Sequence, residues 1–265
     1  SPALTIQVDT VAPNKPAAPD MTAVTDSEGT SNTDNVTSDA TPDFAVSAPP
    51  TGGSVVLYVD GVAVAATYNA VTGTVTPNTA LPEGAHTITY TVVDPAGNAS
   101  PASDPLSITI DSVAPATPAA PDMAAATDSG SSDIDNNTSD STPNFAVSAP
   151  PTGGLVVLYV DGVATQASYD SATGTVTPLV ALADGPHTIT YTLVDAAGNA
   201  SAASPSLSIT IDTQAASAPT VAIAEAAGSV SAAEAADGVA LSVTVPADAQ
   251  VGDVVTTVVT APDGT

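Results

Sequence analysis

The sequence predicts an all-β protein made of tandem β-sandwiches in an end-to-end array. Three observations lead to this prediction. The chain repeats itself, because a shift of 101 residues aligns 34–111 with 135–212 and leaves 58 of the 78 positions identical. Within each copy, Val, Ile and Thr fall in short alternating runs between turn residues. The 24 Pro and 18 Gly are spread along the chain and leave no stretch for a long helix.

The strand signals of the first copy follow one another at short intervals. Ser54–Val59 and Val62–Tyr68 flank Asp60-Gly61, a dipeptide typical of tight hairpin turns. In His86–Val93, apolar residues and Tyr90 alternate with Thr, as in a half-buried strand. The other predicted strands are Met21–Thr25, Thr41–Ser47, Gly73–Thr76 and Leu106–Ile110. Seven short strands in about 100 residues is the number expected of an immunoglobulin-like (Ig-like) sandwich.

The repeat also predicts how the chain is divided. Residues 10–111 and 112–212 are predicted to be two Ig-like repeats, since Ile110–Pro115 closely copies Val8–Pro13. Residues 1–9 read as the last strand of a preceding repeat. Residues 213–265 are predicted to start a further, divergent Ig-like unit that is incomplete, with strands at Val221–Ala224, Val239–Val245 and Val254–Thr260.

Charge and composition exclude several classes of function. The formal net charge is −27, with Lys15 as the only Lys and no Arg, so the chain cannot neutralise a nucleic acid or an anionic membrane surface. No run of 18 apolar residues is present, so membrane insertion is not predicted. The absence of Cys excludes disulfides, zinc–thiolate sites and thiol catalysis.

Several short segments of residues 1–212 occur together in a known context. They read DTVAP, DNVTSDATP, VDG, EGAHTITYTVVDPAGNAS and ITID. The combination resembles the bacterial Ig-like repeats of giant adhesins that type I systems secrete (RTX-type) and that act in biofilm formation or host attachment. The resemblance implies a Ca²⁺-stiffened extracellular spacer on the bacterial cell surface, which holds an adhesive domain away from the cell. The spacer would be a monomeric rod, and its partners would be neighbouring repeats of the same chain.

The predicted strand order indicates where acidic residues meet. Loops of an Ig-like sandwich alternate between its two poles, so the loop after the first strand lies at the same pole as the end of the last strand. Asp111 is therefore predicted to lie where the first repeat meets the loop Asp195-Ala196-Ala197-Gly198-Asn199 of the second. The same reasoning groups Asp9 with Asp94 and Asn98.

Such groups of oxygens suit Ca²⁺, which takes about six to eight oxygen ligands. Almost no basic residue is present to neutralise the carboxylates, so a bound cation is the expected counter-charge. The predicted ligands are Asp9, Asp94, Asn98, Asp111, Asp195, Asn199, Asp212, Asp26, Asp34, Asp39, Asp128, Asp133, Asp135 and Asp140. The alternative for each Asp is an ordinary turn former on a solvated acidic surface.

Other functions have less support in the sequence. An enzyme is not predicted, because the acids recur at linkers and no Ser or Cys constellation accompanies His86 and His187. These two His begin equivalent strands and are predicted to be half-buried, at the rim of the inner face. A glycan- or protein-binding Ig-like module remains an alternative, although the sequence offers no patch that is unique to one repeat. A surface-layer or phage-fibre domain is a further alternative.

Overall fold

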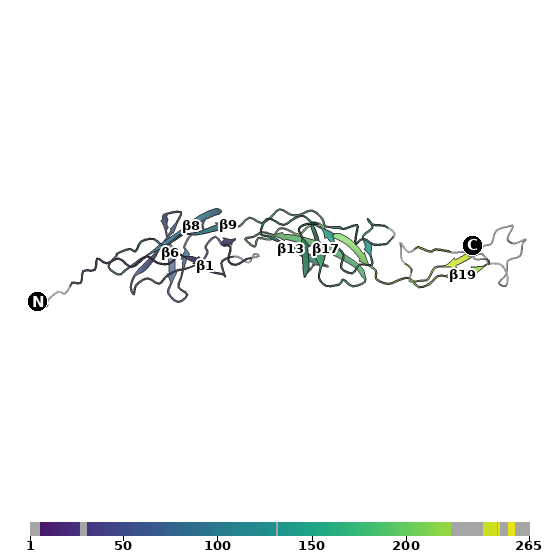
Figure 1. Cartoon of the computed structure of the whole chain (residues 1–265), viewed down its shortest axis with the longest axis horizontal. Helices are drawn as coiled ribbons and strands as arrows, with labels where there is room; N and C mark the ends of the chain where they lie inside the picture. Colours follow the sequence, from purple (N-terminus) through teal and green to yellow (C-terminus); the bar gives the residue numbers. More distant parts are fainter. Residues whose placement is uncertain are drawn as a thin grey trace, which may run out of the picture. The chain divides into compact units, whose positions relative to one another are not determined.

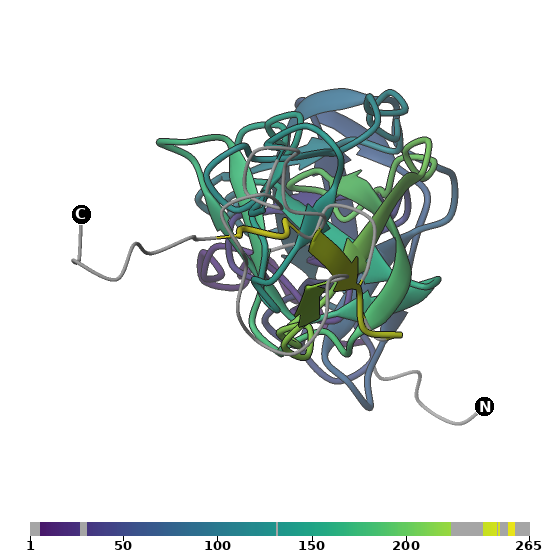
Figure 2. The ribbon, with the colours of Figure 1, turned by 90° about the vertical axis from the view of Figure 1, so that its right-hand side faces the viewer.

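The computed structural model describes residues 6–26, 31–130, 132–223, 241–247, 249 and 254–257. All regular structure in these ranges is β-structure. Figures 1 and 2 show strands joined by loops, with no helical ribbon among the described residues. The all-β prediction is confirmed.

The first repeat is a sandwich of two sheets. One has the strand order β1-β3-β7-β6 and the other the order β2-β9-β8-β4-β5. All neighbouring strands are antiparallel except β2 and β9, which are parallel. The strands are β1 (Asp20–Met21), β2 (Val36–Thr37), β3 (Phe44–Ala45), β4 (Ser54–Val59), β5 (Val62–Val64), β6 (Ala66–Asn69), β7 (Thr74–Pro77), β8 (Gly84–Val93) and β9 (Leu106–Ile110).

The second repeat has the same topology. Its sheets have the orders β10-β12-β16-β15 and β11-β18-β17-β13-β14. Figure 1 marks the central strands β13 and β17. The strands are β10 (Asp122–Met123), β11 (Asn137–Thr138), β12 (Phe145–Ala146), β13 (Leu155–Val160), β14 (Val163–Thr165), β15 (Ala167–Asp170), β16 (Thr175–Pro178), β17 (Gly185–Val194) and β18 (Leu207–Ile211).

Both sheets of a repeat contribute to its core. On β8 the alternation buries Ile88 and Tyr90 completely, and Leu57 on β4 joins them from the neighbouring strand. Phe44 on β3 and Val75 on β7 belong to the same buried cluster from the other sheet. Burial of each such side chain contributes roughly 1.5–3 kcal/mol, which makes these few large residues the main support of a light core.

The hydroxyl groups of the buried tyrosines also accept hydrogen bonds from the backbone. The Tyr90 hydroxyl accepts a hydrogen bond of 2.7 Å from the backbone N–H of Ser47, and the Tyr191 hydroxyl accepts one of 2.8 Å from Ser148. A buried aromatic ring with a partnered hydroxyl is the favourable arrangement for Tyr in a core. Tyr90 and Tyr191 are therefore core residues of their repeats.

The hairpin predicted at Asp60-Gly61 is present. Both residues have positive φ, 52° and 78°, which is the backbone of a type I′ turn. Glycine adopts this conformation without strain, and Asp tolerates it better than most residues. Asp161 and Gly162 repeat the turn in the second repeat, with φ of 52° and 79°.

Four details of the strand prediction are wrong. The predicted strand Thr41–Ser47 is limited to the two residues of β3, Phe44–Ala45. The predicted strand Val62–Tyr68 divides at Ala65, because β5 stays paired with β4 while β6 joins β7 in the other sheet. The first strand ends at Met21, because the chain turns there and the N–H of Asp26 donates to the carbonyl of Thr22 at 2.8 Å. The short strand β2 was not predicted.

The ends of the chain contain less regular structure. Residues 6–9 form no strand, since no described strand pairs with them, and Ile6 and Val8 are exposed. Near the C-terminus, β19 (Thr220–Ile223) pairs antiparallel with β20 (Leu241–Thr244). Residues 254–257 are described and form no strand. Residues 224, 239–240 and 258–260 of the predicted strands lie outside the described residues.

Candidate functional site

The predicted Asp-Asn loops form a compact group of oxygen and nitrogen atoms. In the loop after β8, the Asn98 backbone N–H donates to Oδ1 of Asp94 at 2.8 Å, and the Asn98 amide nitrogen donates to Oδ2 at 2.9 Å. The bond from the Asn98 side chain is the main cause that lowers the pKa of Asp94, so its carboxyl group is ionised at neutral pH. The Asn98 amide also donates to the carbonyl oxygen of Asp9 at 3.1 Å.

The second repeat builds the same group. The Asn199 backbone and amide nitrogens donate to the two oxygens of Asp195 at 2.8 and 3.0 Å. The Asn199 amide donates to the carbonyl oxygen of Asp111 at 2.7 Å. We call the pair of groups the linker clusters, formed by Asp9, Asp94 and Asn98 and by Asp111, Asp195 and Asn199. Each combines a carboxylate, a side-chain amide and a backbone carbonyl.

The structure brings Asp9 and Asp111 to these clusters through their backbone. Their carboxylates serve another purpose, because Oδ1 of Asp9 accepts the N–H of Val11 at 3.0 Å and Oδ1 of Asp111 accepts that of Val113 at 3.1 Å. Asp212 forms the equivalent bond with Gln214 at 3.0 Å. These are local turns, as the alternative for each Asp anticipated. No side-chain pattern could have revealed the carbonyls, since every residue has one.

A second pair of sites lies in the loop after the first strand of each repeat. The side chains of Asp26 and Asp128 are buried, with 1% and 4% of their surface exposed. Oδ1 of each accepts no hydrogen bond from the described residues. Burial raises the pKa of both carboxyl groups, since it disfavours the charged form. A buried polar atom without a partner is costly in a folded protein, so these atoms call for a counter-group.

The charges of other acids act on each buried carboxyl group. After burial, the largest influence on the pKa of Asp26 is a hydrogen bond from the backbone of Asn35, which lowers it. The negative charges of Asp34 and Asp20 raise the pKa of Asp26 further. Around Asp128, the charges of Asp135, Asp133 and Asp122 act in the same way, while Oδ2 accepts the N–H of Asn136 at 3.1 Å. We call these groups the loop clusters, formed by Asp20, Asp26 and Asp34 and by Asp122, Asp128, Asp133 and Asp135.

The carboxylates of Asp39 and Asp140 form local hydrogen bonds. Oδ1 of Asp39 accepts the backbone N–H of Thr41 at 2.8 Å and its hydroxyl at 3.1 Å. Asp140 accepts the same bonds from Thr142 at 2.8 and 3.2 Å. These geometries are those of turn formers, which leave one carboxylate oxygen of each residue for another partner.

The clusters are not complete metal cages by themselves. Within the part of the chain that the structure describes, no three His, Asp or Glu side chains converge closely enough to hold a metal ion. A cation at either cluster would therefore draw further ligands from amide or carbonyl oxygens and water, which are ordinary ligands of Ca²⁺.

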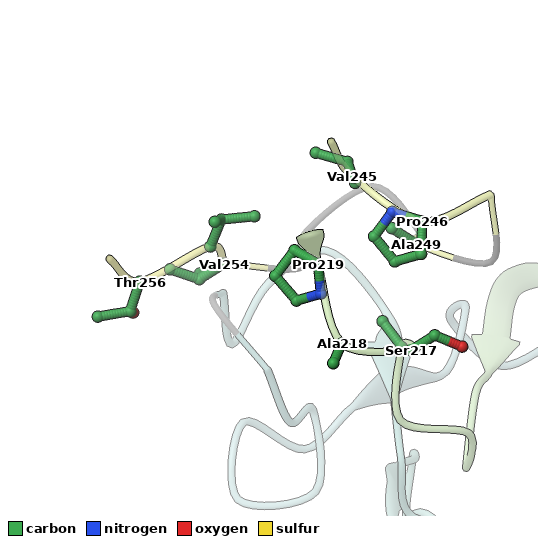
Figure 3. A pocket seen from close by; sticks show the side chains of 10 residues that line it. Ser217, Ala218, Pro219, Val245, Pro246, Ala249, Val254 and Thr256 are labelled. Atoms are coloured by element: carbon green, nitrogen blue, oxygen red, sulfur yellow. The ribbon is translucent and has the colours of Figure 1, made fainter. Parts of the chain in front are cut away.

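Two surface features lie away from these clusters. Leu179 and Val180 are 63% and 58% exposed in the second repeat, whereas the first repeat has Asn78 and Thr79 there. This difference between the repeats was not predicted, but two apolar residues are fewer than a typical binding patch contains. A hollow of about 350 Å³ beside β19 and β20 is lined without any acid, by residues that include Ser217, Ala218, Pro219, Val245, Pro246 and Val254 (Figure 3).

Comparison with protein families identifies the repeats. The family described as bacterial Ig-like domain matches residues 12–112 and again residues 114–213. The chain belongs to the bacterial Ig-like domain family. The linker clusters and the loop clusters are thus features of two tandem bacterial Ig-like domains. Ig-like domains commonly serve as structural or binding modules, and their particular function depends on the sites that each one carries.

Solved structures with a similar fold include other tandem modules. The fibronectin(III)-like modules of Clostridium thermocellum CbhA are 14% identical at a TM-score of 0.42, over 66% of this chain and 87% of theirs. A tetra-tandem repeat from the extending region of a large adhesion protein is 20% identical at a TM-score of 0.25, over 79% of this chain and 52% of its own.

A third similar structure is Bacteroides ovatus SGBP-B in complex with a mixed-linkage heptasaccharide. It is 15% identical at a TM-score of 0.24, over 66% of this chain and 42% of that one. These likenesses are too distant to bear on the function of the bacterial Ig-like domains described above. Comparison with curated proteins gave no significant match. Among the described residues, no helix has the length and apolar character needed to cross a membrane.

Proposed function

We propose that the chain is part of a calcium-rigidified extracellular spacer of a large, type I-secreted (RTX-type) bacterial surface adhesin. In this function the bacterial Ig-like domains project an adhesive domain for attachment to cells or surfaces. The linker clusters are the observation that carries the proposal. In both repeats, an Asp-Asn loop reaches the backbone of the residue that ends the preceding segment, Asp9 or Asp111.

The chemistry of the clusters fits Ca²⁺. Carboxylate, amide and carbonyl oxygens are hard ligands, and Ca²⁺ accepts them in flexible geometry. The buried and unpartnered oxygens of Asp26 and Asp128 provide an independent reason for a cation. Lys15, the only Lys in the chain, pairs with Asp104 at 2.6 Å and is not available to either repeat's clusters. A bound Ca²⁺ would supply the missing positive charge and stabilise the folded state by mass action.

The residues of each linker cluster would then have distinct roles. Asp94 and Asp195 would supply the charged ligand. The amide oxygens of Asn98 and Asn199 would supply a neutral ligand, once each amide group has rotated by half a turn so that its oxygen faces the cation. The carbonyl of Asp9 or Asp111 would tie the linker to the repeat. Because the linker takes part through its backbone, its conformation would become fixed when the cation binds. Asp212 is the corresponding residue after the second repeat, which suggests the same role there.

The proposal can be tested by comparing Ca²⁺, Mg²⁺ and a chelator. Calorimetric titration of the full chain should show Ca²⁺ binding, and ¹⁵N relaxation of Ser112 and Val113 should show slower, more restricted linker motion in Ca²⁺ than in chelator. Mg²⁺ should have less effect at equal concentration, since it demands stricter octahedral geometry and gives up water reluctantly. Equal linker dynamics under all three conditions would contradict the spacer function.

A pair of variants connects the effect to the linker cluster. Asn199→Ala removes the amide that joins Asp195 to the linker, so the Ca²⁺-dependent stiffening at residues 112–113 should be lost. Asp170→Asn is the matched control, because it removes a charge from the same repeat and installs the residue that the first repeat has at the equivalent Asn69. The control should behave as the parent. If Asn199→Ala stiffens normally with Ca²⁺, the linker cluster is not the site.

The alternatives make different predictions. A ligand-binding Ig-like module should bind a glycan or protein through its own loops, with or without Ca²⁺. A surface-layer or phage-fibre domain should assemble with copies of itself or with other structural proteins. Binding of the isolated chain to immobilised glycans, combined with unchanged linker dynamics, would favour the ligand-binding module over the spacer.

A further inference from the structure

The two His side chains make an unusual set of contacts for neutral imidazole rings. Nδ1 of His86 lies 2.8 Å from Oδ2 of Asp60, and its Nε2 lies 2.9 Å from the carbonyl oxygen of Pro82. The second repeat has the same arrangement, with Nδ1 of His187 at 2.7 Å from Asp161 and Nε2 at 2.8 Å from the carbonyl of Ala183.

Both partners of each ring are acceptors. A backbone carbonyl can only accept a hydrogen bond, and an ionised carboxylate can only accept as well. The carboxylate of Asp60 accepts one hydrogen bond from the side chain of His86 and one from the backbone of Thr87. These two bonds lower the pKa of Asp60, so this group is ionised at neutral pH. The pKa of Asp161 is lowered most by the hydrogen bond from the backbone of Thr188 and next by the one from the side chain of His187. A neutral ring has one N–H and would face one of its two acceptors with a lone pair, whereas an imidazolium ring satisfies both.

The surroundings favour the charged ring. The side chains of His86 and His187 are only 9% and 13% exposed, so solvent gives little compensation for a lost bond. The bond from Asp60 raises the pKa of His86 more than burial lowers it. At His187, burial is the largest single influence and lowers the pKa, but the bonds to Asp161 and Ala183 and the charge of Asp161 together outweigh it and raise the pKa.

Among the described residues next to these rings, no other charged group competes for them. Strand β9, which pairs Ile108 opposite His86, carries no charged residue. The nearest acid along the chain, Glu83, accepts bonds from the backbone and hydroxyl of Ser112. In the second repeat, Ile209 lies opposite His187, and Asp184 accepts bonds from Thr213.

We propose that His86 and His187 are imidazolium ions at neutral pH and act as pH-dependent locks inside the repeats. Each lock joins two elements, because Asp60 lies in the β4–β5 turn while His86 and Thr87 lie at the start of β8. Oδ1 of Asp60 also accepts the N–H of Thr87 at 2.8 Å, and Asp161 repeats this bond with Thr188 at 2.8 Å. The two rings are thus internal counter-cations in a chain that has a single Lys.

The sign of the pH dependence follows from the raised pKa. A group that binds its proton more tightly in the folded state stabilises that state fully below its unfolded pKa. The contribution is then lost as the pH rises through the folded pKa. The repeats should therefore lose stability from about pH 6.5 upward.

Nuclear magnetic resonance can test the lock in the full chain, since it contains only two His. In chelator, to exclude any effect of Ca²⁺, ¹⁵N shifts of both ring nitrogens should show them protonated at pH 7, with titration midpoints above 7. The variant Asp60→Asn should lower the midpoint of His86 and leave that of His187 unchanged, so that the second repeat serves as the control.

A second measurement connects protonation to stability. The parent should lose stability to urea between pH 6 and pH 9, and His86→Gln with His187→Gln should flatten that loss. A midpoint at or below 7, or one unprotonated ring nitrogen at pH 7, would overturn the proposal. The shift measurement uses the parent protein, so it decides the matter even if the double variant does not fold.

Discussion

The buried carboxyl group of Asp128 allows a prediction whose sign depends on Ca²⁺. The substitution Asp128→Asn keeps an oxygen that can accept the N–H of Asn136, now 3.1 Å from Oδ2, and removes a buried charge that lies among Asp122, Asp133 and Asp135. Without Ca²⁺, the variant should therefore be at least as stable as the parent at pH 7, because ionisation of a buried and unpartnered carboxyl group is costly. With Ca²⁺, it should be less stable.

The size of the Ca²⁺ effect can be calculated. A ligand at about 100 times its dissociation constant stabilises the folded state by about 2.7 kcal/mol. For a domain of this size, that free energy corresponds to a rise in melting temperature of roughly 10–20 °C. The parent should gain this increment in its second repeat, and Asp128→Asn should lose most of it.

The assay is amide hydrogen exchange at single residues, in Ca²⁺ and in chelator. It reports the two repeats separately, so the first repeat with Asp26 intact is an internal control. Comparing the Ca²⁺-dependent increments, rather than the absolute stabilities, cancels any effect of the new amide group. If the increment of the second repeat is the same in the variant and in the parent, the loop cluster around Asp128 does not bind Ca²⁺.

Two further predictions concern the framework that holds these clusters. Tyr191→Phe removes the acceptor of the Ser148 N–H and should cost about 1–3 kcal/mol of unfolding free energy in urea, since a partly buried donor is left without a partner. An unchanged free energy would mean that water replaces the hydroxyl. Gly154→Ala would place a Cβ 2.1 Å from the carbonyl oxygen of Val194, so it should lower the free energy of unfolding by about 1–3 kcal/mol or more. In Gly162→Ala the new Cβ meets no atom within 4 Å, so this variant should lose less stability, through backbone strain at φ of 79° alone. The reverse order of the two glycine variants would contradict the close packing at Gly154.

The sequence predicted the elements whose pattern is local. The alternation in His86–Val93 is sufficient to place Ile88 and Tyr90 in the core, because side chains of a strand point to opposite faces in turn. The Asp60-Gly61 hairpin was equally visible, since few dipeptides accept two positive φ angles. The segment that follows the hairpin was harder to predict, because nothing in Val62–Tyr68 marks the point at which the chain leaves one sheet for the other.

Features that depend on distant partners could not be predicted. Strand β2 consists of Val36 and Thr37 in a polar loop, and it is a strand only because β9 pairs with it from far along the chain. The linker clusters were predicted as meeting points of side chains, yet Asp9 and Asp111 contribute backbone carbonyls to them. The His–Asp pairs did leave a signal, an Asp 26 residues before a His in both repeats, but that spacing acquires meaning only when the turn and β8 lie together.

The parallel pairing of β2 with β9 also bears on how a repeat responds to tension. The chain leaves each repeat directly after β9 or β18, and that strand is not at the edge of its sheet, because β2 or β11 flanks it on one side and β8 or β17 on the other. A pull along the departing strand would load both ladders in shear, so their hydrogen bonds must break together rather than one after another. The two residues of β2 would thus make the last strand of a repeat harder to extract than a strand held on one side only.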